Sequence, residues 1–114
     1  MANIYKNQKL DLTTNTVTTL YTVASNSRAI VKSILVCDDT NNGSNITVDL
    51  FNGDPASADK FTIFKSKAIA GNATEQLSNE PLIMQESEVL QVTAADANRL
   101  HVVASILEIN REDR

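Results

Sequence analysis

Aromatic side chains are scarce in this sequence, where three Phe, two Tyr and no Trp amount to 4% of 114 residues. Sites for sugars or single-stranded nucleic acids rely on exposed rings against which the ligand stacks. Basic runs are also missing, and the formal net charge is −4. A protein that binds a phosphate backbone normally carries a basic stripe. The composition therefore argues against a nucleic-acid partner and offers little for a sugar site.

Cysteine is rare too, because Cys37 is the single one, which excludes an intrachain disulfide framework. The opening residues, MANIYKNQKLDL, lack the apolar core of a signal peptide, and no stretch reaches membrane-spanning length. We therefore expect a chain without a signal peptide, made and folded in a reducing cytoplasm, with no membrane partner. Only three glycines are present, which is too few for a phosphate cradle, and we expect no cofactor.

Threonine, asparagine and serine are abundant instead. Threonine suits strands, whereas Asn and Ser suit turns, so many short strands joined by polar loops are expected. Segments 28–37 and 100–109 are apolar on both faces, which indicates central strands. The alternation of apolar and polar residues predicts strands at 4–12, 18–23, 28–37, 45–51, 61–65 (extendable to 69), 82–84, 89–93 and 100–109.

A chain of this length forms one domain with one modest core. Turn sequences separate the predicted strands at short intervals, which is typical of a sandwich or jelly roll. We expect an all-β, single-domain, antiparallel β-sandwich, jelly-roll-like, with about eight strands. Residues 1–12 would form an N-terminal arm or edge strand, residues 13–110 the sandwich, and residues 111–114 a charged tail.

Few residues invite a catalytic interpretation. Cys37 and His101 each lie in one of the two doubly apolar segments, so a nucleophilic pair on neighbouring strands is conceivable. Nothing supplies an oxyanion hole, and a lone His without CxxC or HExxH spacing cannot assemble a zinc site. The acids Asp49, Asp54 and Asp59 are interpreted as ordinary loop and strand acids rather than a glycosidase pair. We expect no enzyme, no catalytic residue and no metal site.

One loop faintly resembles a calcium-binding loop. Asp38, Thr40 and Asn42 occupy alternate positions, Gly43 stands at the sharp turn, and Asp49 falls where a closing acid would be. The full pattern has more acids and ends on a bidentate Glu. The segment after the loop is also predicted to be a strand, which would draw Asp49 away. A hairpin loop is the favoured interpretation, and ion binding by this loop is left open.

Segment 20–37, LYTVASNSRAIVKSILVC, resembles a run that recurs in small structural proteins of tailed phages, where two strands flank a short turn. The ending at 81–109 is also similar, so the resemblance covers residues 18–109. Ala24 and Asp38 stand where the family has Pro and Asn, and turn geometry tolerates both departures. The resemblance implies a β-sandwich of the virion without catalytic residues.

The function that this resemblance implies is that of a virion structural protein, and above all a capsid decoration or cement protein bound to the assembled head shell. Its partners would be copies of itself, with a trimer favoured, and the major capsid protein or a tail protein. The alternative is a tail or neck accessory, or an adhesin-type module for a host-surface glycan or receptor. An adhesin would need an exposed ring at one of four positions: Tyr5, Tyr21, Phe51 or Phe64.

Overall fold

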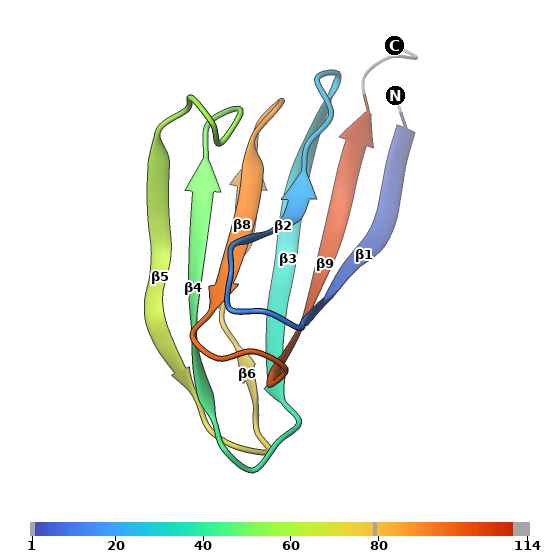
Figure 1. The fold of residues 1–114 in the computed structure, drawn as a ribbon. Coiled ribbons are helices and arrows are strands. Elements are labelled where there is room, and N and C mark those ends of the chain that lie inside the picture. The colour runs from blue at the N-terminus through green and yellow to red at the C-terminus, as the bar shows by residue number, and fades with distance from the viewer. Residues whose placement is uncertain (1, 79, 111–114) are drawn as a thin grey trace.

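A computed structural model describes residues 2–78 and 80–110, and all regular structure in these residues is β-strand (Figure 1). The described part therefore contains no helix that could cross a membrane. The strands are β1 (Ala2–Leu12), β2 (Thr18–Thr22), β3 (Ser27–Asp38), β4 (Ser44–Phe51), β5 (Lys60–Ile69), β6 (Thr74–Gln76), β7 (Leu82–Met84), β8 (Val89–Ala94) and β9 (Leu100–Asn110).

The strands form two antiparallel sheets that pack as a sandwich. Sheet A has the order β1-β9-β3-β6, and β7 also pairs with β3. Sheet B has the order β2-β8-β4-β5. The all-β sandwich predicted from the sequence is confirmed, with nine described strands where about eight were expected. Figure 1 shows β5 and β1 at opposite sides of the molecule.

The two doubly apolar segments are β3 and β9, and they lie side by side in the middle of sheet A. They pair from Ser27 opposite Asn110 to Asp38 opposite Leu100. Their prediction as central strands is therefore correct. A bulge between Val31 and Ser33 interrupts the register of this pair. Bulges of this kind bend a strand and increase its twist.

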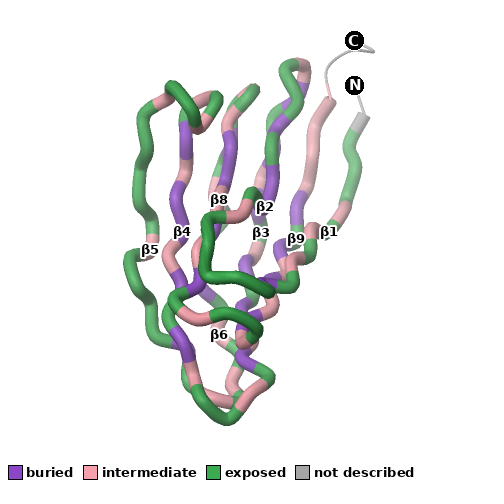
Figure 2. Tube along the Cα trace, in the orientation of Figure 1, coloured by how far each residue is buried: buried purple, intermediate pink, exposed green. Residues whose placement is uncertain are grey.

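The core lies between the sheets and is built from alternate residues of each strand. Ile46 and Val48 of β4 meet Ala94 and Val92 of β8 in sheet B, and sheet A contributes a matching set from β3 and β9. Figure 2 shows this alternation as buried segments along the central strands and an exposed β5. The fully buried large apolar side chains are those of Leu12, Leu20, Val23, Val31, Ile34, Val36, Ile46, Ile69, Met84, Leu90, Leu100 and Ile106.

The ends of the chain differ in what the structure shows. Strand β1 pairs with β9 along its whole length, from Ala2 opposite Asn110 to Leu12 opposite Leu100, and forms one edge of sheet A. Residues 2–12 are thus an edge strand here, one of the two forms expected. The charged tail predicted at 111–114 lies outside the described residues. Strand β6 was not predicted, because its three polar residues carry no apolar alternation.

Candidate interaction surface

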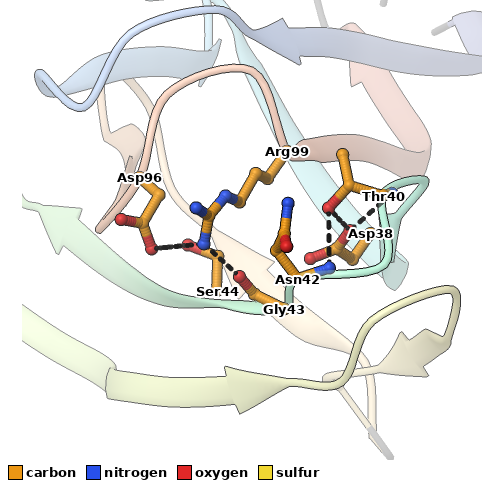
Figure 3. Close-up of polar contacts among 7 residues, drawn as sticks. All are labelled: Asp38, Thr40, Asn42, Gly43, Ser44, Asp96 and Arg99. Carbon is orange, nitrogen blue, oxygen red and sulfur yellow. Dashed lines mark hydrogen bonds and ion pairs between the residues drawn. The ribbon is translucent and has the colours of Figure 1, made fainter.

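The loop that resembles a calcium site is organised by its own hydrogen bonds (Figure 3). The buried Asp38 carboxylate uses Oδ1 to accept from the Thr40 backbone N–H at 2.7 Å and from the Thr40 hydroxyl at 2.6 Å. Thr40 Oγ1 accepts in turn from the Asn42 N–H. Asp49 lies in β4, where it accepts from the Thr62 hydroxyl. This geometry is that of a side-chain-stabilised turn, and within the described residues no three acidic, His or Cys groups are placed to hold a metal.

Arg99 fastens this loop to the loop between β8 and β9. Its Nη1 donates to the Gly43 carbonyl at 2.8 Å and lies 3.3 Å from Asp96 Oδ2. The same Asp96 oxygen accepts from the Ser44 hydroxyl at 3.0 Å. Gly43 has φ +76°, a left-handed conformation that glycine adopts without strain. These contacts fix the end of the sandwich shown in Figure 3 and serve its architecture.

Cys37 and His101 are directly opposite each other in the β3–β9 register, as neighbouring strands would place them. The His101 ring, however, faces two carboxylates: Nε2 lies 3.3 Å from Asp11 Oδ1, and Nδ1 lies 3.7 Å from Asp39 Oδ2. Imidazole activation of a thiol requires a ring nitrogen directed at the sulfur. Here the ring joins β1, β9 and the end of β3, which is a structural arrangement.

The remaining acids are not gathered into a catalytic pair. Asp54 caps the turn that follows it, since its Oδ1 accepts from the Ala56 N–H at 3.0 Å. The Asp59 backbone N–H donates to the Asn52 side chain in the same loop. Asp49 is held by a strand threonine, so the carboxylates of Asp49 and Asp54 both serve local structure.

A polar cluster inside the sandwich ties the two sheets together. The Tyr21 hydroxyl of sheet B donates to Glu108 Oε2 of sheet A at 2.8 Å. Lys6 of β1 lies 3.6 Å from Glu108 Oε1 and 5.2 Å from the Tyr21 ring centroid. Burial, and then the hydrogen bond and negative charge of Glu108, raise the pKa of Tyr21 far above its ordinary value. Sequence analysis missed this cluster because its members are far apart along the chain.

The outer face of sheet A is rich in apolar side chains. One row crosses four strands: Tyr5 is opposite Leu107, Leu107 is opposite Ile30, and Ile30 is opposite Ile83. Tyr5 is 75% exposed and Ile83 is 66% exposed. We call these four residues the apolar row. The rest of the outer face of sheet A comprises Asn3, Asn7, Lys9 and Asp11 of β1; His101, Val103, Ser105 and Ile109 of β9; Arg28, Ser33, Leu35 and Cys37 of β3; and Thr74 and Gln76 of β6.

The outer face of sheet B carries a polar row. This row consists of Thr19, Gln91, Asp49 and Thr62, paired across β2, β8, β4 and β5. Its side chains bond one another, with Gln91 Nε2 donating to Thr19 Oγ1 and Thr62 donating to Asp49. A solvated sheet face is expected to be polar, as this row is. The next row of the same face includes Val89 and Phe51, which are 5% and 9% exposed, so these apolar side chains are covered, whereas Tyr5 and Ile83 of sheet A are exposed.

A second apolar region lies where β5 approaches the β6–β7 segment. Phe61 is 53% exposed and Ile63 is 39% exposed. Ile63 and Phe64 line a narrow cleft with Leu77 and Leu82. This cleft is the open side of the core rather than a separate site.

The four aromatic rings considered for glycan stacking differ in their exposure to solvent. Tyr21 and Phe51 are buried, at 3% and 9% exposure. Phe64 packs against the core as a half-buried side chain. Tyr5 alone of the four is strongly exposed, and its neighbours in the apolar row are aliphatic. A single ring does not make the stacked platform that sugar sites use.

No family model matches the sequence, and no curated protein matches it either. The fold, in contrast, has many counterparts among solved structures. A protein of the T13 particle of infectious bursal disease virus aligns with TM-score 0.57 and 10% identity, over 93% of this chain and 30% of that one. The chain thus spans about 30% of the length of that viral protein.

Two further neighbours match along nearly their whole length. The capsid structure of Helicobacter pylori bacteriophage KHP30 gives TM-score 0.55 and 12% identity, over 97% of this chain and 95% of that one. The endospore appendages of Bacillus, which form disulfide-linked pili, give TM-score 0.53 and 11% identity, over 95% and 88%. The chain has a fold found in viral capsids. At these identities the likeness concerns the fold alone.

Proposed function

We propose that this chain is a non-enzymatic structural protein of a virus particle, most specifically a decoration or cement protein on the head of a tailed phage. The observation that carries this proposal is the exposed apolar row on the outer face of sheet A. An exposed apolar surface of this kind is typical of a protein–protein interface rather than of a catalytic site. Support comes from the full-length match to a phage capsid structure and from the resemblance of segment 20–37 to tailed-phage proteins.

The proposed partners are copies of the chain itself and the major capsid protein or, on the tail, a tail protein. The protein would be located on the virion after synthesis in the host cytoplasm, and its work requires no nucleic acid, membrane or cofactor. The trimer expected from the sequence belongs to this proposal, since shells offer sites of rotational symmetry.

Particle association is tested by mass spectrometry of purified virions, followed by cryo-electron microscopy to find the density of the sandwich. We expect the chain at many copies per particle on the outer surface of the head. A localisation to the tail or neck would move the assignment to the accessory role. Absence of the chain from washed particles would refute a virion role altogether.

The glycan-binding alternative is tested with the purified chain on a glycan array, with Tyr5→Ala as the matched variant. Because Tyr5 is the one strongly exposed ring among the four candidates, an adhesin would lose its signal in this variant. We expect no signal from either protein. Glycan binding that depends on Tyr5 would favour the adhesin over the decoration protein.

A further inference from the structure

We propose that the outer face of sheet A binds the same face of a second copy of this chain, about a two-fold axis that runs parallel to the strands between β9 and β3. This contact rests on the self-association part of the proposed function, and it does not require the particle. It departs from the trimer implied by the sequence, because a two-fold contact of one face with itself closes as a dimer.

The distribution of side chains on this face is that of an interface. Two apolar pairs lie on its central strands, where Val103 of β9 is opposite Leu35 of β3 and Leu107 is opposite Ile30, with the small pair Ser33 and Ser105 between them. Polar residues dominate the flanks, on β1 and on β6. An apolar centre with a polar rim is the usual anatomy of a protein–protein contact. Tyr5, as the exposed aromatic of the apolar row, has the chemistry of an anchor residue.

The face is complementary to itself under the proposed axis. A rotation about a line between β9 and β3 places β1 over β7 of the second copy and β9 over its β3. Tyr5 then faces Ile83 of the second copy, and Leu107 faces Ile30. Every member of the apolar row meets an apolar partner. Sheets pack face to face in this manner about 10 Å apart.

Charge also permits two copies to meet here. The chain has a net charge of −4, so most of its surface repels a second copy. Basic and acidic groups on and beside this face nearly balance: Lys9, Arg28 and Lys32 against Asp11 and Asp39. These five groups sum to a charge of +1, so the excess negative charge of the chain lies elsewhere.

The size of the face indicates a dimer of moderate affinity. Four strand positions across and nine residues along give a footprint of about 19 by 30 Å, or about 570 Å². Stable interfaces use about 800 Å² per partner, and transient ones less than about 600 Å². Strand twist and the bulge in β3 leave less than the full footprint in contact. We therefore expect a dissociation constant in the micromolar range.

The first experiment is sedimentation velocity on the purified chain from about 1 to about 200 µM, a range that brackets the affinity of a small interface. We expect a monomer that converts to a dimer with concentration. Ile83→Lys should weaken the dimer at least about tenfold, because two lysines enter the contact. Phe61→Lys changes an exposed apolar residue outside the face, 53% exposed against 66% for Ile83, and should leave the dissociation constant unchanged. Circular dichroism confirms that both variants fold.

A cross-link tests the orientation. In a Cys37→Ser background, Tyr5→Cys and Ile83→Cys are prepared as two single variants, mixed, and treated with a bismaleimide that spans about 10 Å, the spacing of two packed sheets. Facing residues at this spacing are beyond the roughly 7 Å Cα limit of a direct disulfide, so the spacer is required. Each chain carries one thiol, so any cross-link joins two copies. Dimers should appear on denaturing gels at a higher yield from the mixture than from either variant alone.

A wild-type monomer at the highest concentration, a trimer, or a dimer unaffected by Ile83→Lys would each overturn this contact. The failure of the contact is distinguishable from failure of the proposed function. A chain that is monomeric in solution but present in virions refutes the dimer alone. A chain that dimerises but is absent from virions refutes the particle role alone.

Discussion

Removal of one hydroxyl group tests whether Tyr21 and Glu108 couple the two sheets. Tyr21→Phe keeps the buried ring and deletes the donor of the 2.8 Å hydrogen bond to Glu108. Glu108 stays in place, with Lys6 at 3.6 Å and a side chain only 14% exposed. A hydrogen bond to a charged acceptor contributes about 1.5–3 kcal/mol to folding. We expect Tyr21→Phe to lower the free energy of unfolding by about 1.5–2 kcal/mol at neutral pH.

The effect depends on pH with a definite sign. Burial is the main cause of the raised pKa of Tyr21, and the Glu108 hydrogen bond and charge add to it. Because the folded pKa lies above the unfolded value of about 10, the stabilisation is full below that pH and is lost as pH rises above it. At about pH 11 the ionised unfolded tyrosine favours unfolding by about 1.4 kcal/mol. Tyr21→Phe lacks this contribution, so its deficit should nearly vanish there.

The assay is urea unfolding followed by far-ultraviolet circular dichroism at neutral pH and near pH 11. Protein concentration is kept near 1 µM, below the expected dimer range. Tyr5→Phe serves as the control, because Tyr5 is 75% exposed and its hydroxyl is outside the core. The control should track the wild type at both pH values. A stability gap between wild type and Tyr21→Phe that stays constant with pH would refute the assigned role of Tyr21.

Two further pairs of substitutions test the packing. In Gly71→Ala the new Cβ would lie 2.8 Å from the Asn41 carbonyl carbon, so the loop backbone must shift at a cost of about 1–3 kcal/mol of stability, measured by thermal denaturation. The control Gly53→Ala has only an ordinary contact and should change stability by less than about 0.5 kcal/mol. Ile106→Thr replaces a buried ethyl group with a buried hydroxyl, so it should cost about 2–4 kcal/mol of monomer stability. The control Leu107→Thr changes the adjacent, outward residue and should cost less than about 1 kcal/mol at low protein concentration. Both costs are measured by urea unfolding, and equal losses of stability in the two variants would contradict the assignment of Ile106 to the core and Leu107 to the outer face.

Local alternation made most strands predictable. The sequence around Ile46, Val48 and Leu50 alternates because one face of β4 packs on the core while the other faces outward, and the strand was predicted from it. Strand β6 shows the limit of this signal. Its residues Thr74–Gln76 form a strand only because β3 lies beside them, so no local pattern in the sequence predicts this strand.

The contacts that matter for function depend on register, which local pattern does not determine. The apolar row unites residues from β1, β3, β7 and β9, and a shift of one residue in any pair would send a member to the other face. Tyr21 and Glu108 meet across two sheets from positions 87 residues apart. Both are consequences of strand order, and a single sequence gives strand lengths and faces but not neighbours.

Apolar residues on both faces of β3 and β9 indicate more than a central position of these strands in the sheet. In a two-layer sandwich each sheet has one face on the core and one toward water, so a strand needs apolar residues on only one side. The inward set of β9, which includes Val102, Ala104 and Ile106, satisfies the core. The outward pair Val103 and Leu107 contributes nothing to that core, whereas Gln91 and Thr19 on the outer face of sheet B hydrogen-bond each other. Apolar residues that a monomer leaves in contact with water favour aggregation unless they have a partner. This surplus is the surface that the proposed contact of sheet A with a second copy would bury.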